Sequence, residues 1–240
     1  MDSYNSDRNT YLVKLIENAC FHHENGAYRK AEELYRNILK ELPDLWLIHF
    51  NLGLLLFEQK RFDEALKSYQ QAVSLNDSSN DIHYNMALCQ KACRRYYEAI
   101  GSYQKALAIN PEDQDSLYNL GGCYRLKDDE GSAINCYEQL LALNPKHQSC
   151  LNNLAYMYHR TGDLEKARKY YQALLDINPE HKAADYMLAA LSGEQRSTAP
   201  NSYIMELFDN YSDHYEESLV NQLSYTLPTT LKTLLTRIAP

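Results

Sequence analysis

The sequence predicts an all-α protein built from five consecutive helix–turn–helix repeats. The first observation is a period of 34 residues that runs from Leu12 to His181 without an insertion. When the chain is divided into blocks of this length, position 24 is always tyrosine and position 20 is always alanine. The second observation is that apolar residues recur three and four positions apart within each block, as on one face of a helix. A fixed period in this range is typical of helix pairs that stack on one another.

Three positions of the blocks indicate how the two helices of a repeat meet. The residues at position 24 are Tyr35, Tyr69, Tyr103, Tyr137 and Tyr171. Those at position 20 are Ala31, Ala65, Ala99, Ala133 and Ala167. Position 8 holds Ala19, Gly53, Ala87, Gly121 and Ala155. Small residues allow two helices to cross closely, and the tyrosine rings are expected to fill the space beside the crossing with their hydroxyls at its rim.

The expected elements follow the blocks in order. The repeats occupy residues 12–45, 46–79, 80–113, 114–147 and 148–181. Each has a first helix near positions 1–14 and a second near positions 18–31. Proline at position 32 in four of the blocks ends the second helix.

The remaining segments lie before and after the repeats. Residues 1–11 form a polar lead-in, and residues 182–192 repeat the first-helix pattern, which predicts a capping helix. Residues 193–202 contain Gly and Pro and are expected to be a linker. Residues 203–240 are expected to be a helical segment, because their apolar residues lie four apart.

The period and the recurring positions resemble the tetratricopeptide repeat. The resemblance covers 170 of the 240 residues. It implies a right-handed α-solenoid whose first helices line a concave groove. It also implies a scaffold that binds a peptide or protein segment in that groove, rather than an enzyme.

Asparagines at position 6 are the first candidates for this groove. Four repeats carry them, as Asn51, Asn85, Asn119 and Asn153. An amide has a donor and an acceptor, so a row of amides can hold an extended peptide by its backbone. The row resembles the asparagine ladder of O-linked N-acetylglucosamine transferase. The alternative is that these amides support neighbouring helices.

Aromatic and basic residues add to the predicted groove. Tyr84 and Tyr118 stand at position 5, and Lys91, Arg125 and His159 stand at position 12. Cations placed among aromatic rings suit an acidic or carboxylate-bearing segment. The alternative is that they are ordinary solvated charges.

The C-terminal segment resembles the entry to the catalytic domain of predicted tetratricopeptide-containing methyltransferases. The matching residues are Leu207, Phe208, Asp209, Tyr211, Tyr215, Glu216, Leu219, Leu223 and Tyr225. This resemblance implies that the repeats recruit substrate for a domain that uses S-adenosylmethionine. The last glycine is Gly193, so the glycine-rich cofactor loop of such a domain would have to lie beyond residue 240. Two alternatives remain open: residues 203–240 cap the repeats, or they mediate self-association with a second copy.

The composition of the chain bears on its partners, its location and the kinds of site it can hold. The formal net charge is −8, which argues against nucleic acid as the partner. No apolar run is long enough for a membrane span, and the N-terminal residues lack the pattern of a signal peptide, so we expect a cytoplasmic protein. The six cysteines fall at unrelated positions, and no catalytic, cofactor or metal site is expected in this chain.

Overall fold

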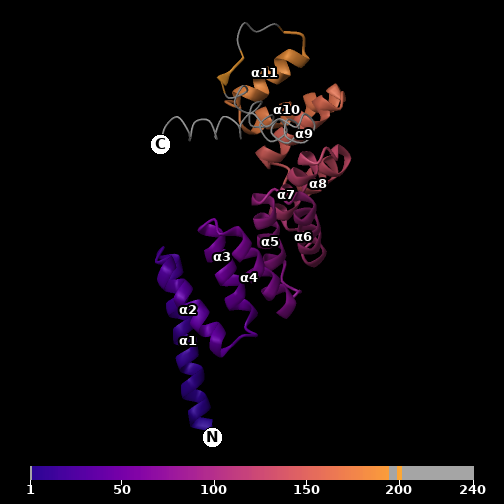
Figure 1. Ribbon diagram of the computed structural model, residues 1–240. Helices are drawn as coiled ribbons and strands as arrows, with labels where there is room; N and C mark the ends of the chain where they lie inside the picture. Colours follow the sequence, from indigo (N-terminus) through magenta and orange to yellow (C-terminus); the bar gives the residue numbers. More distant parts are fainter. Residues whose placement is uncertain (1, 195–198, 202–240) are drawn as a thin grey trace, which may run out of the picture. The chain divides into compact units, whose positions relative to one another are not determined.

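The computed structural model describes residues 2–194 and 199–201, and these form eleven α-helices and no strand (Figure 1). The all-α fold class is confirmed. The chain divides into two compact units at Leu143 and Asn144. Residues 203–240 lie outside the described part, and so do the helical segment and the self-association predicted for them.

Unit 1 contains eight helices that pack in chain order, as Figure 1 shows. They are α1 (Asp2–Glu24), α2 (Tyr28–Glu41), α3 (Trp46–Glu58), α4 (Phe62–Leu75), α5 (Asn80–Ala92), α6 (Tyr96–Ile109), α7 (Gln114–Leu126) and α8 (Glu130–Leu143). From α2 on, the bounds lie within about one residue of the positions expected from the repeat. The lead-in is also helical, because α1 already begins at Asp2.

Unit 2 contains the next three helices. They are α9 (Gln148–Arg160), α10 (Leu164–Ile177) and α11 (Lys182–Leu191). Helix α9 packs against α10, and α10 packs against α11. Ala155, Ala167 and Tyr171 are all buried, so this unit has the same kind of crossing as the repeats of unit 1.

The position-24 tyrosines lie deep in the crossing between the two helices of a repeat. A Cβ atom added to Gly53 would stand 2.6 Å from Cε1 of Tyr69, so the ring rests directly on the glycine. The expectation that the hydroxyls reach the rim is wrong for Tyr69 and Tyr103. Both hydroxyls are buried without a hydrogen-bond partner in the described part of the chain. The reason is the depth of the ring, which carries its para position into the core.

Position 15 of every repeat adopts a left-handed backbone conformation in the turn between the two helices. Glycine occupies it in the first and fifth repeats, as Gly26 and Gly162. The three middle repeats place Lys60, Arg94 and Asp128 there, with φ of 59°, 59° and 57°. A side chain in this conformation clashes with its own backbone, so these three turns are strained.

Replacing Arg94 with glycine is therefore expected to raise the free energy of unfolding by about 0.5–1 kcal/mol, because relief of the backbone strain outweighs the greater freedom that glycine gives the unfolded chain. Urea unfolding would measure the change. The neighbouring substitution Arg95→Gly is the control, since Arg95 has φ of −83° and pairs with Glu98. The control should lower stability. A loss of stability in both variants would contradict the prediction.

Candidate peptide-binding groove

The predicted groove residues of unit 1 lie on its first helices. Asn51 is on α3, Asn85 is on α5, and Asn119 is on α7. The tyrosines and cations predicted beside them are on α5 and α7. All seven of these side chains are partly exposed, as a binding surface requires. Helical spacing places positions 5, 9 and 12 on one face, with position 6 at its margin.

The three amides of unit 1 make different contacts. Asn85 and Asn119 each donate from Nδ2 to the backbone carbonyl four residues earlier, at 2.8 and 2.9 Å. This bond fixes the amide and leaves its oxygen to face other groups. Oδ1 of Asn119 accepts from Lys91 Nζ at 3.0 Å, whereas Nδ2 of Asn51 donates to Cys20 Sγ at 3.7 Å. The alternative of structural support therefore holds in part for Asn51 and Asn119.

Aromatic rings pair regularly below this surface. Tyr84 packs on Tyr103 and Tyr118 packs on Tyr137, each with ring centroids 6.0 Å apart. The same arrangement joins Phe50 to Tyr69 at 6.1 Å. The position-5 rings are thus held by the tyrosines of the core while one side stays partly exposed. Such rings are rigid contact surfaces for a bound segment.

Charged groups lie at both ends of these helices. Lys91 is held toward the next repeat by its bond to Asn119. At the opposite end, burial raises the pKa of Tyr84, and the nearby carboxylates of Asp115 and Asp113 raise it further. A neutral phenol therefore stands beside two carboxylates there. These first helices thus carry cations near their C-terminal ends and acids near their N-terminal ends.

A polar network near the first repeat was not anticipated from the sequence. His23 Nδ1 lies 3.2 Å from the hydroxyl of Tyr35, which donates to Cys20 Sγ at 3.7 Å. The other ring nitrogen of His23 lies 3.4 Å from Glu58 Oε2. Burial, with the Cys20 contact, raises the pKa of Tyr35 far above its usual range. Cys20 and His23 occupy positions 9 and 12 of the first helix, which share one helix face. This shared face was the only sign of the network in the sequence.

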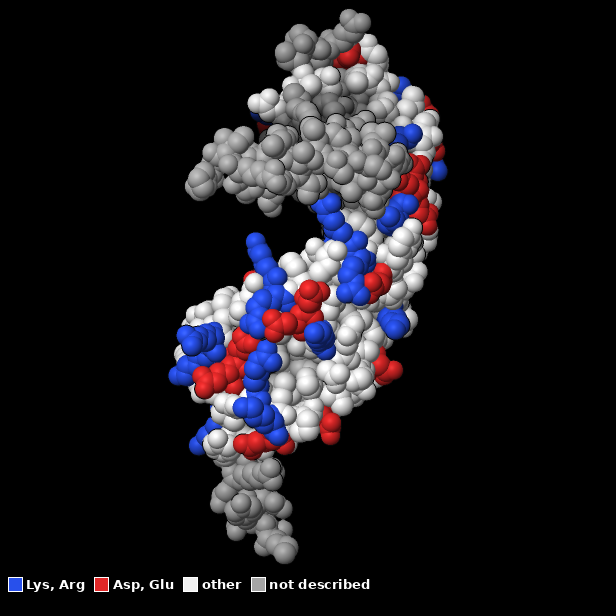
Figure 2. Space-filling model, viewed as in Figure 1, with Lys and Arg blue, Asp and Glu red and all other residues white. Residues whose placement is uncertain are grey.

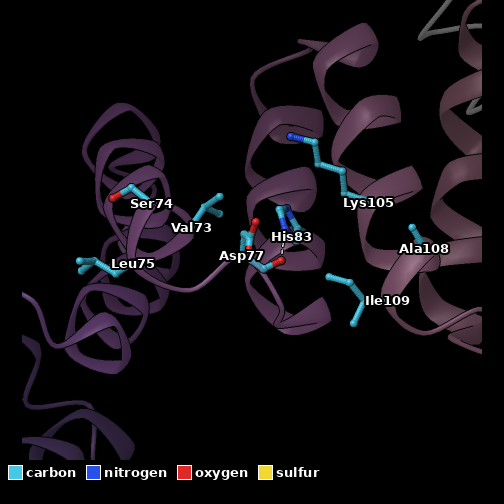
Figure 3. A pocket seen from close by; sticks show the side chains of 8 residues that line it. All are labelled: Val73, Ser74, Leu75, Asp77, His83, Lys105, Ala108 and Ile109. Atoms are coloured by element: carbon cyan, nitrogen blue, oxygen red, sulfur yellow. Dashed lines mark hydrogen bonds between the residues drawn. The ribbon is translucent and has the colours of Figure 1, made fainter.

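A separate cavity of about 630 Å³ lies outside the groove, between the C-terminal ends of α4 and α6 (Figure 3). His83 lines this cavity, and Nε2 of His83 donates a hydrogen bond to the backbone carbonyl of Asp77 at 3.0 Å (Figure 3). A carbonyl only accepts, so Nε2 carries the proton. Other repeats have leucine at this position, as Leu117 and Leu151. His83 is thus a packed residue that fastens α5 to the connection before it.

Unit 2 carries the last two predicted residues, Asn153 and His159, on α9. Both are partly exposed. Nearby, Tyr158 and Tyr170 stack with centroids 5.6 Å apart, and Lys166 Nζ lies 4.6 Å from the centre of the Tyr158 ring. Aromatic and cationic groups therefore also accompany the asparagine of this unit.

None of the groups of His, Cys, Asp and Glu in residues 2–194 and 199–201 could hold a metal ion. Over the same ranges, no helix combines the length and the apolar character needed to cross a membrane.

Solved structures with a similar fold are numerous. MamA matches with a TM-score of 0.65 at 22% identity, covering 68% of this chain and 95% of that one. YrrB, described as a TPR protein with an unusual peptide-binding site, matches with a TM-score of 0.65 at 18% identity, covering 72% and 89%. The pilF protein of Pseudomonas aeruginosa matches with a TM-score of 0.64 at 18% identity, covering 93% and 99%. At these identities the similarity shows the fold.

Family models give the more specific result. Models of the tetratricopeptide repeat match residues 46–79, 81–113, 114–147 and 131–182. No curated protein sequence matches the chain at a significant level. None of these findings supports the methyltransferase resemblance of residues 203–240. The matched models together span more than half of the sequence, and the chain therefore belongs to the tetratricopeptide-repeat family.

Proposed function

We propose that this protein is an interaction scaffold whose first helices bind a peptide or protein segment. The observation that carries the proposal is the repeated arrangement of partly exposed groups on α3, α5 and α7. Each helix offers an amide at position 6 beside an aromatic ring at position 5. The ring packs on the core, so the surface is already organised before a partner binds, which lowers the entropic cost of binding.

The partner that this surface suits best is an extended segment with carboxylates. Oδ1 of Asn85 has no partner among the described residues and can accept from a backbone N–H of the segment. Lys91 can pair with a carboxylate after leaving Asn119, because an ammonium group has three donors. The similarity to YrrB, described as having a peptide-binding site, is in accord with this proposal.

Replacing Asn85 and Asn119 together with alanine is expected to weaken peptide binding by about 5- to 150-fold, because each lost hydrogen bond contributes roughly 0.5–1.5 kcal/mol. The probe is a fluorescein-labelled peptide selected on the full chain from a random phage-displayed library. Fluorescence polarisation measures the affinity, and thermal unfolding measures the stability.

The matched control replaces Asn37 and Asn135, two exposed asparagines on the second helices α2 and α8. It makes the same chemical change away from the groove and should leave the affinity unchanged. If the groove variant binds the peptide as tightly as the original chain while remaining folded, the asparagines do not contact the segment. Equal losses in both double variants would place the binding surface elsewhere.

A further inference from the structure

The two rows of loops in unit 1 carry opposite charge. Because the helices of a pair run antiparallel, the turns within pairs lie on one side and the connections between pairs lie on the other (Figure 1). We call the turns 58–61, 91–95 and 125–129 the basic edge, and the connections 42–47, 76–81 and 110–115 the acidic edge. The basic edge holds seven Lys and Arg against three acids, and the acidic edge holds six acids and no Lys or Arg.

Some charges of the basic edge are used within the protein. Arg61 binds Glu32 at 2.7 Å and Glu64 at 2.8 Å, and it lowers the pKa of both carboxyl groups. Lys60, next to it, is exposed and has no ion-pair partner in the described part of the chain. Arg94 is exposed at the equivalent position of the next repeat. Figure 2 shows Lys and Arg interspersed with Asp and Glu on the visible face of the protein.

The backbone is strained at Lys60 and Arg94. Both occupy position 15, where the outer repeats relieve the strain with Gly26 and Gly162. A charged side chain is thus kept in three successive turns, with the acidic Asp128 in the third, although it costs stability there.

The acidic edge is free to attract a partner. Asp44, Asp77, Asp81 and Glu112 are exposed, and their carboxylates form no ion pair within the described residues. Six acids without an internal cation repel one another, so a cationic row placed against them would be favoured. Helices of 13 residues separate the two edges by about 20 Å. One small ion or one narrow segment cannot neutralise both.

We propose that the basic edge of one copy of this protein binds the acidic edge of a second copy. Every turn of the basic edge carries at least one Lys or Arg and every connection of the acidic edge carries at least one acid, so both rows follow the period of the repeats. A second copy offers a complementary row in that spacing by construction. The net charge of −8 opposes association at long range, but the Debye length is about 10 Å at 0.1 M salt, so contacting rows still attract.

The test is analytical ultracentrifugation of the full chain over a concentration series. We expect self-association in 100 mM NaCl, with a Kd about tenfold higher or more in 500 mM NaCl, because contacts between charged rows are screened. Two charge-reversed variants are then prepared. One carries Lys60→Glu with Arg94→Glu, and the other carries Asp77→Lys with Glu112→Lys. None of the four positions belongs to the proposed groove.

Each variant should self-associate much more weakly by itself, because the net charge of its changed edge falls from +4 to 0 or from −6 to −2. An equimolar mixture of the two should associate again, since the unchanged basic edge of the second variant can bind the unchanged acidic edge of the first. The control Lys67→Glu with Lys105→Glu makes the same change in net charge as Lys60→Glu with Arg94→Glu, but on the second helices α4 and α6, and should associate like the original chain.

A monomeric original chain at all concentrations would overturn the proposal. So would reversed variants that associate as the original chain does, because another surface would then be responsible. A mixture that stays monomeric would show that the edges do not meet. Peptide binding in the groove is measured separately, so failure of either proposal leaves the other intact.

Discussion

Replacing Tyr103 with alanine is expected to lower the free energy of unfolding by about 3–5 kcal/mol, because removing a buried ring loses its burial and leaves a cavity. Tyr103 is fully buried in a cluster with Ala87, Ala99 and Leu120. Burial raises the pKa of its phenol far above the usual range. Urea unfolding monitored by circular dichroism would measure the loss.

Removing only the hydroxyl separates the ring from its polar atom. Tyr103→Phe is expected to leave stability unchanged or to raise it by about 1 kcal/mol, because a buried hydroxyl without a partner is unfavourable. Tyr35→Phe is the matched control, since the hydroxyl of Tyr35 contacts His23 and Cys20. It should destabilise the protein by roughly 0.5–1.5 kcal/mol. Equal effects of both substitutions would show that the two hydroxyls do not differ as described.

The second large effect is expected at Gly53. An alanine Cβ there would lie 2.6 Å from Cε1 and 2.7 Å from Cδ1 of the buried Tyr69 ring. The ring cannot withdraw into solvent, so α3 and α4 must move apart. We expect Gly53→Ala to lower the free energy of unfolding by about 1–3 kcal/mol, as overpacking of a core usually does.

Gly101 provides the control for this substitution. It also lies within a helix, α6, but a Cβ atom there would meet nothing within 4 Å. Gly101→Ala should raise stability by about 0.5–1 kcal/mol, because alanine has the higher helix propensity. The two alanines are thus expected to act with opposite signs in thermal unfolding. A stabilising Gly53→Ala would mean that the crossing adapts as it does around Ala87.

The partial exposure of the candidate groove residues could be predicted because the repeat fixes which residues share a face. The partly exposed positions of Asn85, Tyr84 and Lys91 follow from their places on a first helix. The partners of those side chains could not be predicted. Lys91 reaches Asn119, and Asn51 reaches Cys20, across 28 and 31 residues. Such contacts depend on how two successive repeats are spaced and rotated, which the periodicity within one repeat does not specify.

The sequence by itself determined the all-α fold, the limits of most helices and the small residues at each crossing. The reason is that a helix requires apolar residues at helical spacing, and a close crossing requires small residues. Only the tertiary structure decided how deep each position-24 tyrosine lies and whether its hydroxyl has a hydrogen-bond partner. Tyr35 and Tyr103 stand at the same position of the repeat, yet only Tyr35 has His23 beside it. The physical reason is that a change of a few tenths of an ångström in the distance between two side chains decides whether they form a hydrogen bond. The packing of different helices against one another sets that distance.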